Sequence, residues 1–215
     1  MTPQHASAYA REICQLAPVI PVLVVEDTAH AVPLAEALVA GGLPVLEVTL
    51  RTPSALEVIR AMAEVPGGVV GAGTLITPRD VHAAKEAGAL FGVSPGVTDE
   101  LAAACEAEEL PLLAGVATVG EAMRMLARGY DVMKFFPAET NGGAAALKAF
   151  AGPLPQVSFC PTGGVTPANA RDYLALPNVL CVGGSWIADK RLMRTGDWSG
   201  IEALARTAAG LAVAS

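Results

Sequence analysis

One lysine of the chain stands inside an apolar run, where an amine could act as a nucleophile. Lys134 lies within the stretch 132–136, and because side chains alternate along a strand, Val132, Lys134 and Phe136 are expected to share one face. The other lysines fall on predicted helices or beyond the last predicted strand: Lys85, Lys148 and Lys190. Burial disfavours the charged form of an amine, and the neutral form attacks a ketone. The alternative is a structural lysine paired with a buried carboxylate.

A second apolar run, 45–50, carries polar side chains on alternate positions. Glu47, Thr49 and Arg51 form one face, and the other face is entirely apolar. The apolar face is expected to pack on helices, which places the polar face inside the fold. A carboxylate near a reactive amine can transfer protons, directly or through one water, and the arginine fork suits a carboxylate. The alternative is an internal Glu–Arg pair that holds the structure together.

Two further runs end in paired glycines, at 161–164 and 182–185. Paired glycines expose backbone N–H groups and let an oxyanion approach closely, although a Gly-Gly pair is also common in tight turns. Thr162 and Ser185 add hydroxyl donors beside them. We therefore predict an anion site where these two runs end.

These residues belong to a pattern that repeats along the chain, in which a short apolar run, a turn and an Ala-rich helical stretch follow one another. The predicted strands are 19–25, 45–50, 69–73, 90–94, 112–115, 132–136, 157–161 and 179–183. The predicted helices are 8–16, 31–40, 54–65, 78–87, 99–109, 119–128, 144–150, 167–176 and 198–212. Helix starts are expected at Thr-Pro pairs and helix ends at glycines: Thr52-Pro53, Thr77-Pro78, Thr166-Pro167, Gly41-Gly42, Gly88 and Gly129.

Eight strand–helix cycles predict an α/β fold, a (β/α)8 TIM barrel, as a single domain over residues 1–215 with an extra N-terminal helix. An open doubly wound sheet is the alternative, but no glycine fingerprint for a dinucleotide opens the first helix after VVEDTAH. In a barrel the catalytic groups gather where the strands end, and the second and sixth strands face each other. Glu47 and Lys134 are therefore expected to reach toward a common centre.

The composition limits the partners of such a barrel. A net charge of −7 argues against nucleic acid, because binding to a phosphate backbone needs a basic surface. Hydrophobic residues make up 53% of the chain, yet no run approaches the roughly 20 apolar residues that span a bilayer. The beginning of the chain does not resemble a secretory signal, so we expect a cytoplasmic protein. The four cysteines, without CxxC spacing, are expected to be buried thiols rather than metal ligands or disulfides: Cys14, Cys105, Cys160 and Cys181.

The strand ends and the segments around them resemble one family, the bacterial 2-keto-3-deoxy-6-phosphogluconate (KDPG) aldolases, which often also act on 4-hydroxy-2-oxoglutarate. The matching segments are HAVPLAEALVAGGLPVLEVTLRT, GAGT, SPG, KFFPAETNGG, FCPTGGVTPAN and VGGSW. KFFPAE and CPTGG are quite specific to the family. The resemblance implies a class I aldolase, a carbon–carbon lyase that needs no cofactor and no metal and assembles as a homotrimer.

The same resemblance implies a role for each matched residue. Lys134 would form the Schiff base and Glu47 would act as the acid and base. Arg51 and Thr74 would bind the pyruvate carboxylate, and Pro95 and Phe136 would line that pocket. The residues implied for the phosphorylated end of the substrate are Thr162, Gly163, Gly164, Gly184 and Ser185.

Three other functions remain open at this point. An aldolase for the C4-epimeric 2-keto-3-deoxy-6-phosphogalactonate is one, although a polar residue at Thr162 favours the gluconate type. A non-catalytic barrel that binds phosphorylated sugars is another, but it would not need a buried lysine opposite a glutamate. A metal-dependent aldolase is the third, and no His, Asp or Glu set at the strand ends has metal-ligand spacing.

Overall fold

Eight short parallel strands form the centre of the protein, for which a computed structural model describes residues 1–211. The strands are β1 (Val19–Leu23), β2 (Val45–Thr49), β3 (Val69–Gly73), β4 (Phe91–Val93), β5 (Leu112–Val116), β6 (Val132–Phe135), β7 (Ser158–Pro161) and β8 (Val182–Gly184). Each strand from β1 to β7 pairs with its neighbour in sequence, and β1 also pairs with β8. A bridge between Thr162 and Gly183 and the bond from Leu180 N to Phe159 O (3.0 Å) link β7 to β8. The predicted (β/α)8 barrel is confirmed.

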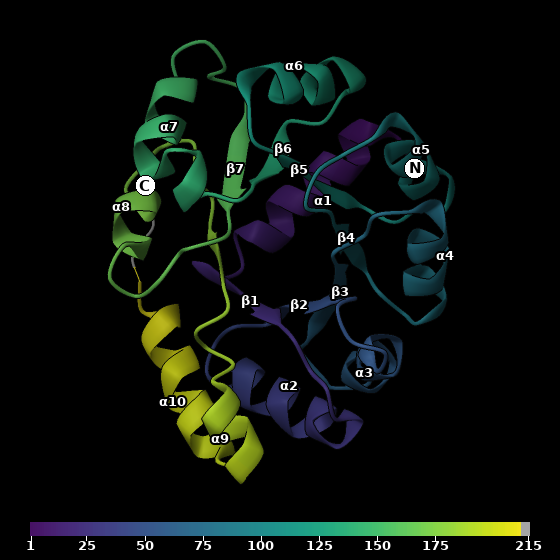
Figure 1. Cartoon of the computed structure of the whole chain (residues 1–215), viewed down its shortest axis with the longest axis vertical. Coiled ribbons are helices and arrows are strands. Elements are labelled where there is room, and N and C mark those ends of the chain that lie inside the picture. Colours follow the sequence, from purple (N-terminus) through teal and green to yellow (C-terminus); the bar gives the residue numbers. More distant parts are fainter. Residues whose placement is uncertain (212–215) are drawn as a thin grey trace.

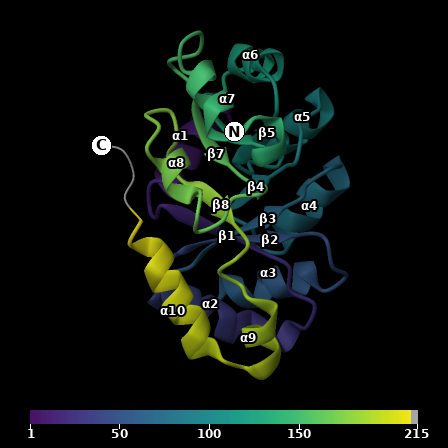
Figure 2. The same cartoon turned by 60° about the vertical axis from the view of Figure 1, so that its left-hand side comes forward.

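The helices surround this ring of strands (Figure 1). They are α1 (Pro3–Cys14), α2 (Ala31–Ala40), α3 (Ala55–Ala63), α4 (Pro78–Glu86), α5 (Asp99–Ala107), α6 (Val119–Arg128), α7 (Gly143–Phe150), α8 (Ala170–Leu174), α9 (Lys190–Thr195) and α10 (Trp198–Ala209). Two 3-10 turns, η1 (Thr28–His30) and η2 (Glu139–Asn141), follow β1 and β6. The C-terminal α10 packs along α2 beside α9, as the turned view in Figure 2 shows.

The extra N-terminal helix closes one end of the barrel. Ser7 Oγ of α1 accepts a hydrogen bond from Asp131 N (2.9 Å), directly before β6. Ile13 and Cys14 pack into the inner apolar cluster together with Val132. Because α1 covers the end at which the strands begin, the opposite end, where the strands finish, is left for chemistry. We call that end the mouth.

The expected alternation of side chains is present in both strands that carry the candidate catalytic pair. Val45 and Val132 belong to the inner cluster, whereas Leu46 and Met133 belong to the layer between strands and helices. A strand covered on both sides needs apolar residues on both faces, which accounts for the high apolar content. None of the described helices is long and apolar enough to cross a membrane. The four cysteines are buried free thiols.

Several of the predicted helix starts and ends are confirmed. Thr77 caps α4 in a capping box with Asp80, and Pro78 occupies the first turn. Gly42, Gly88 and Gly129, just past the ends of α2, α4 and α6, have positive φ angles of 91°, 92° and 111°.

Other boundaries differ from the prediction. Thr52 does not cap α3, which begins at Ala55; its hydroxyl donates instead to Val25 O (2.8 Å), in the segment after β1. Thr166 likewise does not cap α8, because Asn169 takes the cap position after a tight turn from Thr166. The eighth strand runs over Val182–Gly184 rather than 179–183. The last predicted helix ends at Ala209, and its final residue, 212, lies outside the described residues, as do 213–215 of the predicted domain.

Candidate active site

Lys134 and Glu47 meet inside the barrel. The Nζ atom of Lys134, on β6, lies 3.2 Å from Oε1 of Glu47, on β2. The two residues are only 5% and 3% exposed, so this contact is shielded from bulk water. The ring of Phe136 lies on the same side, with its centroid 5.2 Å from Nζ. The structure thus brings together the predicted nucleophile and the predicted acid/base.

Glycines on neighbouring strands make room for this pair. A Cβ atom on Gly73 of β3 would overlap the carboxylate of Glu47. Gly115 of β5 pairs in register with Lys134, and its N–H donates to Ser94 Oγ (3.3 Å), while a Cβ there would overlap Pro95. Bulkier residues at these positions would displace the carboxylate or the loop after β4.

Burial raises the pKa of Glu47 above its usual value, and the thiol of Cys160 adds to this effect. The Lys134 ammonium opposes the shift without cancelling it. A glutamate whose pKa is raised by burial exchanges its proton closer to neutral pH than an exposed carboxyl does, which suits Glu47 to proton transfer beside Lys134.

Arg51 lies at the mouth rather than inside the barrel, which corrects the expectation for this residue. β2 ends at Thr49, so the alternation that points Glu47 and Thr49 inward no longer applies two residues later. Arg51 is exposed and lines a hollow of about 560 Å³, as Ser185 does. Hydroxyl donors of Thr52 and Ser54, both bonded to Val25 O (2.8 and 2.9 Å), hold the loop that carries it.

One lining residue of the hollow lies next to Glu47 in the sheet. Val22 of β1 pairs in register with Glu47 and lines the hollow. Its other lining residues come from the segment after β1, from the loop after β8 and from the first residue of α9: Val24, Trp186, Ala188, Asp189 and Lys190. Trp186, Ala188, Asp189 and Lys190 were not predicted as site residues, because the pattern of apolar residues did not predict α9. Asp189 and Gly196, which cap α9 at its start and end, are the signals that could have revealed it.

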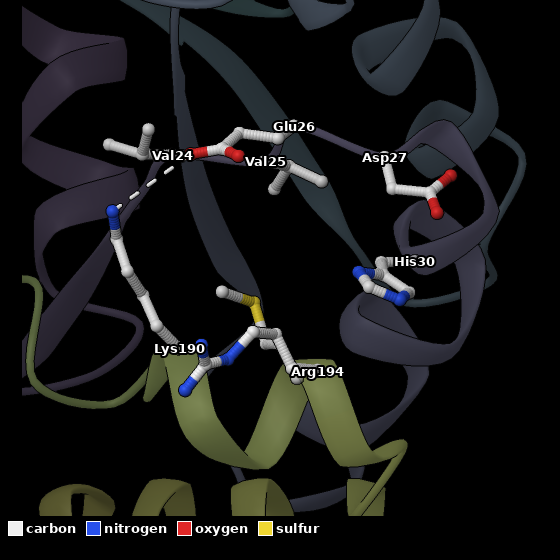
Figure 3. Close-up of a pocket in the computed structure, with 8 residues that line it drawn as sticks. Val24, Val25, Glu26, Asp27, His30, Lys190 and Arg194 are labelled. Carbon is white, nitrogen blue, oxygen red and sulfur yellow. Dashed lines mark ion pairs between the residues drawn. The ribbon is translucent and has the colours of Figure 1, made fainter.

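A second hollow of about 490 Å³ adjoins the first, since both are lined by Val24 and Lys190 (Figure 3). Lys190 extends toward Glu26, with Nζ 4.0 Å from Oε1. Arg194, one turn along α9, reaches to the same side, and His30 lies across the hollow. Lys190 is 74% exposed, so its weak ion pair leaves it able to face an anion in either hollow.

The first residue after β7 lies against β8 at the mouth. A bridge joins Thr162 to Gly183 of β8, and a Cβ on Gly183 would overlap the Thr162 side chain. Thr162 Oγ1 is buried and has no hydrogen-bond partner among the described residues, so a ligand could satisfy it. Gly163 and Gly164 have φ angles of 96° and 80°, which glycine adopts readily. The predicted anion-binding residues are therefore neighbours, with Gly184 ending β8 and Ser185 exposed beside it.

The remaining predicted residues also follow strand ends. Thr74 comes directly after β3 and has a φ angle of 65°, rare for a β-branched residue and typical of functional sites that store strain. Pro95 follows β4 and is half-buried, as is Phe136 after β6. Every predicted site residue thus lies inside the barrel or at its mouth.

Comparison with known proteins agrees with this geometry. The KDPG and KHG aldolase family model matches residues 10–204. The chain belongs to this family. The predictions of an aldolase and of the family are confirmed.

Individual relatives are similar over nearly their whole length. The chain is 53% identical to the KHG/KDPG aldolase of Escherichia coli K12 over 93% of this chain and 94% of that one. It is similar to the crystal structure of the aldolase from Zymomonas mobilis ATCC 29191, with a TM-score of 0.90 and 53% identity over 94% and 97% of the two chains. A Legionella pneumophila KDPG aldolase, with pyruvate captured as a covalent carbinolamine, is 48% identical with a TM-score of 0.90 over 93% and 98%.

Proposed function

We propose that this aldolase cleaves 2-keto-3-deoxy-6-phosphogluconate to pyruvate and glyceraldehyde 3-phosphate through a Schiff base on Lys134. The buried contact between Lys134 Nζ and Glu47 Oε1 carries the proposal, and Arg51 and Ser185 line a hollow at the mouth of the same barrel. Cations lie at the entrance, at Arg51 and Lys190, which suits a substrate that is anionic at both ends.

In the first half of the reaction the amine of Lys134 adds to the C2 carbonyl, and loss of water leaves an iminium. This cation accepts the electron pair of the C3–C4 bond as it breaks. Glu47, through a water, takes the proton of the C4 hydroxyl, and glyceraldehyde 3-phosphate leaves. The enamine that remains is protonated at C3, and hydrolysis releases pyruvate and restores the amine.

The same chemistry applies to 4-hydroxy-2-oxoglutarate, which would give pyruvate and glyoxylate. This second substrate has the same 2-keto acid end and lacks the phosphate. Arg51, Thr74, Pro95 and Phe136 would therefore serve both substrates, whereas Thr162, Gly163, Gly164, Gly184 and Ser185 would serve the phosphate. We further propose a cytoplasmic homotrimer that uses neither metal nor organic cofactor. Sedimentation tests the trimer, and activity in the presence of a chelator tests the independence from metal.

Borohydride reduction of the protein mixed with pyruvate, followed by peptide mass analysis, tests the proposal directly. A pyruvyl adduct on Lys134, accompanied by loss of activity, is the expected result. An unmodified Lys134 in folded protein would contradict the Schiff-base mechanism. Thermal stabilisation by a phosphorylated sugar acid without any product would instead favour a non-catalytic binding barrel. Rates measured on the gluconate and galactonate epimers decide between the two aldolase activities.

Replacing Arg51 with glutamine should weaken recognition of the 2-keto acid end. Removal of a charged hydrogen-bonding partner is expected to raise KM about ten- to one-hundred-fold for both substrates. The KM of each substrate and inhibition by pyruvate provide the measurement. Arg60→Gln, on the exposed side of α3, is the matched control and should leave both values unchanged. A normal KM in the Arg51 variant would place the carboxylate elsewhere.

A further inference from the structure

The turn formed by Gly163 and Gly164 rests on the segment that follows β6. Ala138 N donates to Thr162 O (2.8 Å), and Glu139 N donates to Gly163 O (3.1 Å). Two successive backbone hydrogen bonds therefore fix the position of this turn relative to β6, the strand that carries Lys134. Glu139, which makes the second bond, is the first residue of η2.

The side chain of Glu139 packs against the same turn. A Cβ atom on Gly164 would lie 2.6 Å from Cγ and 2.7 Å from Cβ of Glu139, so the glutamate stem occupies the space beside this glycine. From another side, Asn169 Nδ2 donates to Gly164 O (3.1 Å). Gly164 is thus held by contacts from two segments, and its N–H direction depends on both.

A buried tyrosine holds the carboxylate of Glu139. Tyr173, on α8, is 1% exposed, and its hydroxyl donates to Glu139 Oε1. Burial raises the pKa of Tyr173, and the hydrogen bond and charge of Glu139 raise it further, so the hydroxyl stays protonated and remains a donor. Among the described residues, Tyr173 is the side chain that hydrogen-bonds to this carboxylate.

We propose that Glu139 and Tyr173 are positioning residues that set the Gly163–Gly164 turn for a phosphate group. The inference rests on the proposed function, because it takes the phosphate of the substrate as the ligand of this turn. Tyr173 would position the turn in two ways. It keeps the Glu139 stem packed against Gly164, and it holds the Glu139 carboxylate away from the site where the phosphate would bind.

Removal of the tyrosine hydroxyl should affect the phosphorylated substrate selectively. In Tyr173→Phe the carboxylate is free to swing toward the turn, where it repels a phosphate. We expect KM for 2-keto-3-deoxy-6-phosphogluconate to rise about three- to ten-fold, with kcat little changed. Both constants for 4-hydroxy-2-oxoglutarate should stay at their wild-type values. Glu139→Gln keeps an acceptor for the hydroxyl and removes the charge, so its KM for the phosphorylated substrate should rise less than that of Tyr173→Phe.

Tyr130 provides a matched control. It is also buried, and its hydroxyl lies 3.3 Å from Oε1 of Glu106, near the start of β6 and far from the mouth. Tyr130→Phe loses an equivalent bond and should change neither KM. The proposal is wrong if Tyr173→Phe raises KM for both substrates equally, or if Tyr130→Phe reproduces its effect.

Binding of inorganic phosphate separates this proposal from the function on which it rests. Calorimetry of the wild-type protein and of Tyr173→Phe needs no turnover. A several-fold weaker affinity in the variant supports the positioning role even if neither substrate is cleaved, whereas equal affinities overturn it. Absence of both cleavage and a pyruvate adduct in the wild-type protein would refute the aldolase reaction instead.

Discussion

Replacing Lys134 with methionine should abolish aldol cleavage while the barrel stays folded. Methionine retains most of the volume of the side chain and removes the amine that forms the iminium. Loss of a covalent nucleophile is expected to lower kcat by about 10⁴-fold or more. A coupled assay for pyruvate release gives the rate, and borohydride reduction with labelled pyruvate should leave the variant unlabelled.

The Lys134 variant is expected to fold because its buried partner can become neutral. Glu47 would remain buried without its ion pair, but its raised pKa allows it to take up a proton and become neutral. Circular dichroism and thermal unfolding check the fold. Lys148→Met, on the exposed side of α7, is the matched control and should keep full activity. Substantial cleavage by the Lys134 variant would rule out a Schiff base at this position.

Much of the fold could be predicted because its signals are local. Thr77 and Pro78 begin α4 wherever that helix lies in space, and Gly129 ends α6 through its own backbone freedom. The meeting of Glu47 and Lys134 needed one further step. Each lies on the inward face of a strand, and eight parallel strands in a ring place the second opposite the sixth.

Features that depend on contacts between distant segments could not be predicted in this way. Thr52 resembles a helix cap in sequence, but its hydroxyl donates to the carbonyl of Val25 in the segment after β1. Threonine rarely adopts a positive φ angle. The sequence therefore did not predict the strained backbone of Thr74. The contact of Tyr173 with Glu139 joins residues 34 positions apart and depends on how α8 packs beside η2.

The site therefore divides into two parts with different origins. The buried pair is specified by strand alternation and by the glycines that leave it room, such as Gly73. The anion end is specified by backbone turns held by long-range contacts. Changes to the pair should alter chemistry for every substrate, whereas changes around Gly164 should alter only the recognition of phosphate.

Replacing Glu47 with glutamine should slow proton transfer and leave the attack by Lys134 possible. Glutamine has nearly the same shape and can still accept a hydrogen bond from Nζ, but it cannot take a proton from the C4 hydroxyl. Loss of a general base is expected to reduce kcat about 10²- to 10⁴-fold. Borohydride with pyruvate should still label Lys134 in this variant, at least in part. An unlabelled Glu47 variant would mean that the carboxylate is needed to form the Schiff base itself.

The pH dependence of kcat also tests the assignment of Glu47 as the base, because it predicts the direction in which kcat changes with pH. A base acts only when it is ionised, so wild-type activity should fall as the pH drops through the pKa of Glu47. Burial raises that pKa above the 4.5 of an ordinary glutamate, which moves the acid limb to higher pH than an exposed carboxyl would give. The Gln variant should lose this limb, whereas Glu57→Gln, on the surface of α3, should keep it. An acid limb that persists unchanged in the Glu47 variant would assign the proton transfer to another group.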